Sequence, residues 1–456
     1  GHPGTLPTIN KEAVKKVLKV GVALGAELAD FSEFDRKNYF YPDIPKGYQI
    51  SQYKHPLVKG GELEVEIKNQ SANWRTKIKI TRIHLEEDTA KSSHDTGDYS
   101  LVDFNRAGIP LMELVTEPVI HSGSEAAEFA KELQLLLRYL GASDANMEKG
   151  EMRVEANVSV SKTDTFGVKV EVKNLNSFKA VERAIAYEVE RQIAVIESGE
   201  KVIQETRGWD ENKQKTFSQR LKEESHDYRY FPDPDLPKLK ISEISEFSEE
   251  NLRKELPELP WEKRERLKKE FSLKDEAIEI FMQDMTLGEF FESVAFHLET
   301  EFPSSIPLGN SVSKSADAIL LASNYIISDL SGLMKDKNIS SNELKMEAKD
   351  FAKLIAMADK GEISSRAAKD VLKIIFEEGG DPEKIVKEKG LAQTSDDSFL
   401  KKIIDEVIKN NPAVVEEYKN GKENALQFLV GQGMKLSKGK ANPGVLQKML
   451  KEKLGK

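Results

Sequence analysis

The sequence predicts an α+β protein in which an antiparallel-sheet cradle is followed by a helical connector and a helical tail. Three observations support this prediction: apolar and polar residues alternate at strand spacing in the first half, two stretches with helical spacing interrupt these strands, and strand patterns disappear from Phe247 onward. A chain of 456 residues is long enough for two to four domains. We expect the cradle over residues 1–240, the connector over 241–310 and the tail over 311–456.

The first strand pair is predicted upstream of residue 81. Leu63, Val65 and Ile67 alternate with glutamates, and residues 77–80 then alternate lysine with isoleucine across a polar turn. The apolar phase changes at Thr81–Arg82, which is typical of a β-bulge. We therefore expect a hairpin whose second strand is re-aimed after the bulge.

A second strand pair is predicted over residues 153–160 and 168–173, where valines alternate with charged and polar residues. One amphipathic helix begins at Ser124, a favourable N-cap, and ends before Gly141. Another helix is expected over residues 177–199. Strands that mix with helices in this order favour an α+β layer over a doubly wound fold.

Composition restricts the class of protein. The chain has no cysteine, which excludes disulfides and thiolate sites within it and suits a reducing cytoplasm. No apolar run approaches the ~18 residues of a membrane span, so no membrane association is expected. The net charge is −10 overall, whereas seven lysines and one glutamate from Gly431 to Lys456 make that segment +6. A basic tail on an acidic body can contact phosphates, although a solvated helix end would look the same.

The common phosphate-binding motifs are missing, since there is no G-x-x-x-x-G-K-[ST] and no G-x-G-x-x-G after a strand. The acidic run at residues 84–88 is the first candidate for phosphate chemistry of another kind. In a strand, His84, Glu86 and Asp88 share one face, while Glu87 falls on the apolar face. A carboxylate there is costly unless it is paired or metal-bound. The alternative is that the strand has already ended and these charges are solvated.

Glu113 raises the same question, because it is the only charge in the apolar stretch 108–115, just after Arg106. It is either a functional carboxylate or the partner of a buried arginine. Two such carboxylates, Glu87 and Glu113, could hold Mg²⁺, which takes a few carboxylate oxygens together with water and phosphate.

Residues 35–52 are dense in donors for an anion or a nucleotide, although a pinned structural loop would have the same composition. Arg153, Glu155 and Asn157 could form a functional strand face, but cross-strand ion pairs explain them more simply. The polar-aromatic loop 225–230 fits either substrate contact or packing at a domain edge.

Long motifs distributed along the whole chain resemble the B subunit of the glutamyl/aspartyl-tRNA amidotransferase, the GatB family. These strings are too long for a chance match. They are FDRKNYFYPDI and PKGYQISQ within 34–52, TRIHLEED at 81–88, YSLVDFNRAG and PLMELVTEP within 99–118, VKNLNSF at 172–178, QETR at 204–207, SHDYRYFPDPD at 225–235, SSRAAK at 364–369, YKNGK at 418–422, and GQ, KGK and ANP within 431–443.

The resemblance implies a cytoplasmic ligase that acts in protein biosynthesis. A member uses ATP to phosphorylate the side-chain carboxylate of Glu-tRNA(Gln) or Asp-tRNA(Asn). Ammonia from the glutaminase, which is the A subunit, then displaces the phosphate, in a heterotrimer completed by the C subunit. The fold implied is a catalytic cradle followed by helical segments and a tail that engage tRNA.

The same resemblance assigns roles to residues. Glu87 and Glu113 match metal-binding carboxylates of the family, with ATP and Mg²⁺ as the implied cofactors. We expect phosphate or aminoacyl contacts from Arg36, Lys37 and Arg106. The expected nucleotide-binding residues are Lys37, Tyr48, Gln49 and Arg106, and the expected tRNA-binding residues are Lys435, Lys438 and Lys440.

Two features depart from the family pattern. The chain starts at Gly1, near the G-L-P-G-like stretch that ends an N-terminal segment in other members, and that segment supplies a further metal ligand. If the ligand is truly absent, the alternative is a non-catalytic tRNA-binding or assembly subunit. The tail also reads Gly431-Gln432-Gly433-Met434, with a glycine at a helical position that members usually fill with an apolar residue, at a cost of about 1 kcal/mol in helix preference.

Overall fold

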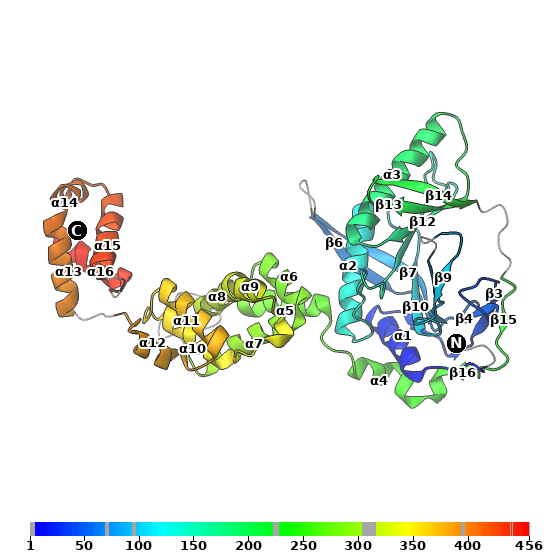
Figure 1. The fold of residues 1–456 in the computed structure, drawn as a ribbon, viewed down its shortest axis with the longest axis horizontal. Coiled ribbons are helices and arrows are strands. Elements are labelled where there is room, and N and C mark those ends of the chain that lie inside the picture. The colour runs from blue at the N-terminus through cyan, green and yellow to red at the C-terminus, as the bar shows by residue number, and fades with distance from the viewer. Residues whose placement is uncertain are drawn as a thin grey trace. The chain divides into compact units, whose positions relative to one another are not determined.

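The computed structural model separates into two compact units, Gly1–Pro260 and Trp261–Lys456 (Figure 1). Sheets and helices build the first unit, and helices dominate the second, so the predicted α+β class is confirmed. The residues that the structure describes are 5–68, 73–93, 97–221, 228–302, 316–393, 397–437, 439 and 441–455.

The main sheet of the first unit is organised around one long strand, β7 (Asn73–Glu87). β6 (Glu62–Lys68) pairs with its first half, and β5 (Val58–Lys59) and β10 (Pro110–Thr116) pair with its second half, all antiparallel. β1 (Glu27–Leu28) extends the sheet beside β5. The predicted hairpin is therefore confirmed as β6 and β7.

The predicted bulge is confirmed at Thr81. Val115 pairs with Arg82 and the next residue, Thr116, pairs with Ile80, so Thr81 is the extra residue in β7. A bulge adds one residue to one strand and reverses the faces that later side chains occupy. The acidic run at the end of β7 is therefore positioned by this bulge.

A second sheet has the order β11-β12-β13-β14, with α2 (Gly123–Tyr139) and α3 (Phe178–Glu197) packed together nearby. Most pairs are antiparallel, but β12 and β13 are parallel because α3 connects them as a crossover. Ser177 caps α3 as predicted, whereas α2 is capped by Ser122 rather than Ser124. The strands are β11 (Val154–Val158), β12 (Val170–Leu175), β13 (Glu205–Asp210) and β14 (Lys215–Leu221).

Smaller sheets complete the first unit. β15 (Phe231–Pro232), β3 (Asp35–Asn38) and β4 (Tyr48–Ser51) form a three-stranded sheet, and β4 also contacts β7. The remaining described elements of this unit are α1 (Lys11–Ala23), α4 (Glu249–Lys254), β2 (Phe31–Ser32), β8 (Lys91–Ser93), β9 (Leu101–Asp103), β16 (Leu239–Lys240) and the 3₁₀ turns η1 (Ile241–Glu243) and η2 (Ser245–Phe247).

The first unit extends past the predicted boundary at residue 240, because α4 packs on α1 and Lys15 pairs with Glu255 at 2.8 Å. The second predicted boundary, near 310, lies outside the described residues. Residues 241–260 belong to the sheet-containing unit, and the division into cradle, connector and tail stays a prediction.

Helices build the second unit, and an isolated bridge joins Ile363 and Ala392. No helix in the described parts of the chain is long and apolar enough to cross a bilayer. The elements are α5 (Pro260–Phe271), α6 (Asp275–Gln283), α7 (Met285–Thr300), α8 (Ala316–Asn324), the π-helical η3 (Tyr325–Leu330), α9 (Ser331–Lys337), η4 (Ser341–Glu343), α10 (Ala348–Asp359), α11 (Ser365–Glu378), α12 (Pro382–Lys389), α13 (Asp397–Asn410), α14 (Pro412–Lys419), α15 (Asn424–Leu436) and α16 (Pro443–Leu454).

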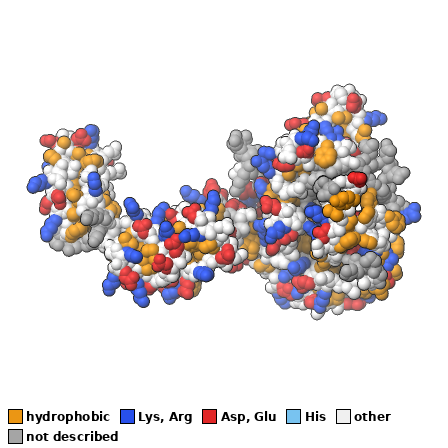
Figure 2. All heavy atoms as spheres, in the orientation of Figure 1, with side chains coloured by type: hydrophobic (Ala, Val, Ile, Leu, Met, Phe, Trp, Pro, Cys, Tyr) orange, Lys and Arg blue, Asp and Glu red, His pale blue; other side chains and the backbone are white. Residues whose placement is uncertain are grey.

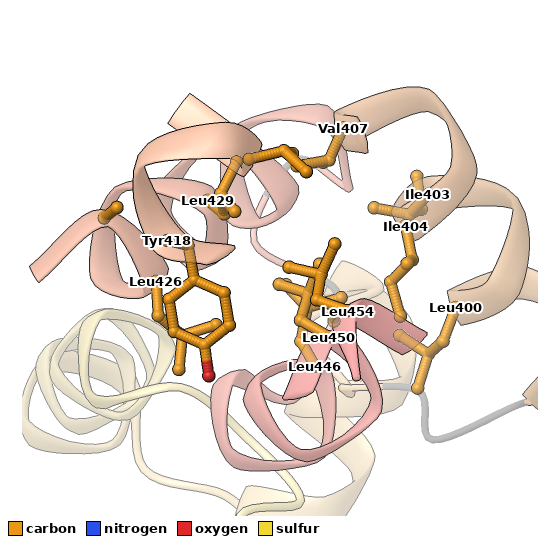
Figure 3. Packing of buried hydrophobic residues seen from close by; sticks show 13 residues of the cluster. Leu400, Ile403, Ile404, Val407, Tyr418, Leu426, Leu429, Leu446, Leu450 and Leu454 are labelled. Carbon is orange, nitrogen blue, oxygen red and sulfur yellow. The ribbon is translucent and has the colours of Figure 1, made fainter. Parts of the chain in front are cut away.

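The last four helices, α13 to α16, enclose a core of their own (Figure 3). Leu400, Val407, Leu429, Leu446 and Leu450 are completely buried in it. Their helical spacing produces one apolar face on each helix, and these faces meet in the middle. The tail that carries the predicted tRNA-binding lysines is thus a packed helical module.

Candidate active site

Strand register brings three potential metal ligands together on one face of the main sheet. Glu113 in β10 lies directly opposite His84 in β7, and Glu86 follows His84 by two residues, so their side chains share a face. His84 Nε2 lies 3.6 Å from Glu86 Oε2 and 4.0 Å from Glu113 Oε1. Among the described residues, these three form the one candidate metal cluster, with one ligand atom of each within 4.8 Å of the others.

The surroundings of this cluster keep Glu86 ionised. Burial by itself raises the pKa of the Glu86 carboxyl, but the adjacent imidazole of His84, the positive charge of Lys37 and a hydrogen bond from Ser51 outweigh it, and the pKa lies below its ordinary value. Ser51 Oγ donates to Glu86 Oε2 at 2.9 Å. Glu86 is therefore a fixed anion at neutral pH, whereas Glu113 is 45% exposed and can accept a ligand from solvent.

The donor set fits a divalent cation. Two carboxylates are the protein ligands that Mg²⁺ typically takes, with water and phosphate completing the shell. The imidazole of His84 adds a donor that also suits other divalent metals. His84 Nδ1 is buried and has no hydrogen-bond partner among the described residues, so Nε2 is the ring nitrogen that faces the two carboxylates.

Tyrosines lie beside this cluster. Tyr53 and Tyr230 stack with their ring centroids 4.5 Å apart, and Tyr228 makes edge contacts with both Tyr230 and Tyr39. Burial, followed by the charges of Glu86 and Glu113, raises the pKa of the Tyr230 phenol, so this side chain stays neutral. Figure 2 shows hydrophobic side chains, with tyrosines counted among them, gathered on the visible face of this unit.

The role of Glu87 as a metal ligand stays a prediction, and its surroundings differ from those of the cluster. It lies opposite Pro110, so strand alternation turns its side chain away from the face that carries Glu113. The Glu87 carboxylate pairs with Lys46 and accepts a hydrogen bond from the Ile50 amide at 2.8 Å. The structure therefore joins His84 and Glu86, rather than Glu87, to Glu113. Sequence spacing placed His84 and Glu86 on one face, but it could not supply the register that sets Glu113 beside them.

Arg36 is held by carboxylates rather than left open to a phosphate. Its Nε and one terminal nitrogen donate to Asp233 at 2.9 Å and Asp235 at 2.7 Å. The guanidinium also lies 4.2 Å from the ring centre of Tyr48. The side chain of Asp233 is fully buried, so this arrangement secures β15 on β3. The structure thus gives Arg36 contacts with two carboxylates, and its contact with a phosphate stays a prediction.

The other predicted donors differ in their accessibility. Lys37 lies with its Nζ 5.1 Å from the ring centre of Tyr228 and close enough to Glu86 to lower its pKa. Gln49 is buried, and its amide donates to the carbonyl of Glu87 at 2.7 Å. Of these side chains, Lys37 remains the one that faces the cluster with its charge.

Arg106 forms part of a clamp at the end of β7. Its Nε donates to Asp88 Oδ2 at 3.0 Å, and a terminal nitrogen donates to the carbonyl of Gly150 at 2.8 Å. Arg153 donates to the other oxygen of Asp88 at 2.7 Å. The sequence pattern predicts only a solvent-exposed strand face for Arg153. Its contact with Asp88 cannot be predicted from sequence spacing.

The structure describes one of the three predicted tail lysines. Lys435 is exposed near the end of α15, as a contact with an RNA backbone requires. Lys438 and Lys440 lie outside the described residues. A role in binding tRNA stays a prediction for all three.

Comparison with known proteins supplies the family. The model of the GatB/GatE catalytic domain matches residues 1–246, which contain the whole cluster, and the model of the GatB domain matches residues 309–454. The chain belongs to the GatB family.

Relatives that are named as the B subunit of an aspartyl/glutamyl-tRNA(Asn/Gln) amidotransferase align with nearly the whole chain. The protein from Thermodesulfovibrio yellowstonii is 45% identical over 99% of this chain and 90% of its own length. The Persephonella marina protein is 44% identical over 100% of this chain and 91% of its own length. The Rickettsia conorii protein is 46% identical over 99% of this chain and 89% of its own length.

Proposed function

We propose that this chain is the B subunit of a glutamine-dependent tRNA amidotransferase and activates a carboxylate on mischarged tRNA. The substrates are Glu-tRNA(Gln), Asp-tRNA(Asn) or both, and the protein partners are the A and C subunits in the cytoplasm. Membership of the GatB family supports this function. The observation that carries it is the cluster of His84, Glu86 and Glu113 within the matched catalytic domain.

The chemistry proposed has two steps. An oxygen of the substrate carboxylate attacks the γ-phosphorus of ATP, and ADP leaves with the electrons of the broken anhydride bond. Ammonia then attacks the activated acyl carbon, and inorganic phosphate leaves to give the amide. A carboxylate is a poor acylating group until its oxygen is phosphorylated, which is why ATP is needed before ammonia can react.

The chain's own residues position these reactants. Phosphoryl transfer depends mostly on positioning and on stabilising the charge of the transferred group. His84, Glu86 and Glu113 would hold Mg²⁺, which neutralises phosphate charge when bound. Lys37 adds a positive charge beside Glu86, where it can attract a phosphate oxygen or the substrate carboxylate.

The test uses the chain assembled with the A and C subunits, with ATP, glutamine and each mischarged tRNA supplied separately. Glu113→Gln and Glu86→Gln should lower ATP-dependent amidation at least ~10²-fold, because each removes an anionic metal ligand. The glutaminase activity of the A subunit reports correct assembly. Glu87→Gln is the matched variant on the opposite face of β7, and a smaller loss is expected.

Two results would overturn the proposal. If the assembled wild-type enzyme formed no ATP-dependent product with either tRNA, the enzymatic function would be excluded and a binding or assembly role would replace it. If Glu113→Gln retained normal turnover while Glu87→Gln lost it, the cluster defined by the strand register would not be the metal site.

A further inference from the structure

We infer that Arg106 and Arg153, held together by Asp88, form a second anion-binding position that takes the polyphosphate of the nucleotide next to the cluster of His84, Glu86 and Glu113. This inference rests on the proposed function and adds Arg153 as a binding residue and Asp88 as a positioning residue.

Positive charge predominates in the group of Arg106, Arg153 and Asp88. Asp88 accepts from Arg106 Nε at 3.0 Å and from Arg153 at 2.7 Å, so two guanidinium groups share one carboxylate. The group therefore carries a net charge of about +1. Arg36 shows the opposite balance, because its one guanidinium contacts both Asp233 and Asp235.

The two arginines are both accessible to a ligand and held in place. The Asp88 side chain is only 7% exposed, whereas those of Arg106 and Arg153 are 36% and 54% exposed. Arg106 is fixed further by its bond to the Gly150 carbonyl, and the Thr89 amide donates to Asp88 at 3.0 Å. A buried anion thus orients two partly exposed cations, which reduces the entropy lost when they bind a ligand.

Asp88 directly follows β7, the strand that carries His84 and Glu86. Asp88 follows Glu86 by two residues, and its amide still donates to the carbonyl of Ile109 at 2.8 Å, which continues the pairing of β7 with β10. Strand alternation places Asp88 on the face that carries Glu86 and His84, about 7 Å further along. A polyphosphate held at the metal cluster can therefore extend toward Arg106 and Arg153.

The guanidinium groups of Arg106 and Arg153 are chemically suited to a polyphosphate. A guanidinium presents several donors in a plane and binds phosphate oxygens better than a single ammonium does. Metal ligands at one end and arginines at the other match the charge pattern that phosphoryl transfer requires. Arg153 comes from the residue just before β11, so the second sheet contributes to a site that is otherwise built on the main sheet.

The experiment compares Arg153→Gln with Arg183→Gln in the enzyme assembled with the A and C subunits. Arg183 is a matched control, because it lies on α3 of the same unit, is 43% exposed and bonds Gln214 at 3.0 Å. We expect Arg153→Gln to raise the KM for ATP and the Kd for ATP by roughly 10- to 100-fold, the loss of one or two charge-assisted hydrogen bonds. The KM for aminoacyl-tRNA and glutaminase activity should stay within about twofold of wild type.

Asp88→Asn tests the positioning role. It removes the anion that orients Arg106 and Arg153, so the KM for ATP should rise although the net positive charge of the group increases. Raised salt should weaken ATP binding more steeply than in wild type. Circular dichroism and thermal unfolding show whether each variant is folded. If Asp88→Asn does not fold, Arg153→Gln alone decides, because it leaves Asp88 paired with Arg106.

The outcomes separate this inference from the proposed function. If wild type transfers phosphate and Arg153→Gln matches it, or if Arg183→Gln loses as much, the inference is wrong and the function stands. If only the KM for aminoacyl-tRNA changes, the anion bound is a tRNA phosphate and the assignment to the nucleotide is overturned. If wild type shows no ATP-dependent product, the function fails, and the Kd for ATP still decides whether Arg153 binds phosphate.

Discussion

At the scale of single residues, two cations that are adjacent in the sequence make different contacts. Arg36 and Lys37 are adjacent in β3, yet Arg36 is committed to Asp233 and Asp235, while Lys37 lies beside Glu86. Successive side chains of a strand point to opposite faces, which separates the two cations. Residue type alone therefore does not distinguish a structural cation from one that faces the cluster.

This separation predicts opposite results for the two positions. Arg36→Ala should lower the free energy of unfolding by about 3 kcal/mol, because it leaves the buried carboxylate of Asp233 without its cation. Lys37→Ala should change stability by less than ~1 kcal/mol but reduce ATP-dependent turnover in the assembled enzyme. Urea unfolding and the amidation assay measure the two effects. Equal losses of stability would contradict the assignment.

At the scale of elements, the two glycines of α15 meet different surroundings. A Cβ added at Gly431 would touch nothing within 4 Å, whereas one added at Gly433 would lie 2.4 Å from Cδ2 of the buried Leu446. Gly433 thus allows α15 and α16 to approach closely. This close approach explains Gly433, for which the sequence alone indicates only a cost in helix preference.

Alanine substitutions at Gly431 and Gly433 should therefore have different effects on stability. Gly431→Ala should stabilise α15 by about 1 kcal/mol, because it removes backbone freedom from the unfolded chain. Gly433→Ala gains the same preference but must displace Leu446, so it should show no net gain. Hydrogen exchange of peptides from α15 would report both variants. Equal protection in the two variants would show that Leu446 moves aside without cost.

Asp381 shows how one element depends on pH. It caps α12 by accepting from the amides of Glu383 and Lys384 and also pairs with Lys353. Hydrogen bonding to Lys353 outweighs the effect of burial and, with the two amides, lowers the pKa of the Asp381 carboxyl. Its contribution to stability is therefore full above its unfolded pKa of about 4 and is lost as the pH falls through the lower folded value.

Two variants test this linkage. Asp381→Ala should destabilise α12 by about 1 kcal/mol at pH 7, because it removes the cap. Asp381→Asn keeps the cap but cannot ionise, so its stability relative to wild type should improve as the pH falls from 6 to 3. Hydrogen exchange of α12, corrected for intrinsic rates, would measure this. A pH-independent difference would exclude the ionised carboxylate as the cause.

At the scale of the whole molecule, the cluster belongs to one unit. His84, Glu86 and Glu113 all lie in Gly1–Pro260, which has its own buried core. Residues 5–260 expressed alone should therefore fold and bind Mn²⁺ or Mg²⁺ with the affinity of the full chain. Titration calorimetry with a Glu113→Gln control would measure this. Loss of metal binding in a folded fragment would show that the second unit contributes to the site.

Local patterns in the sequence were sufficient for much of the architecture. Alternation predicted β6, β7, β11 and β12, the change of phase predicted the bulge at Thr81, and Ser177 marked the start of α3. Each signal depends on residues that are close in the chain, because strand and helix periodicity and capping are local properties. The GatB family was also recognisable from its motifs alone.

Which residues of distant segments lie beside each other was determined only by the tertiary structure. The sequence singled out Glu113 and the acidic run of β7, but the pairing of Glu113 with His84 follows from the register between two strands separated by a long connection. A shift of one residue would have presented Glu87 instead. The contact of Arg153 with Asp88 likewise joins two sheets. Side chains on one strand reveal a shared face by their spacing, whereas the residue opposite them depends on packing that no local pattern records.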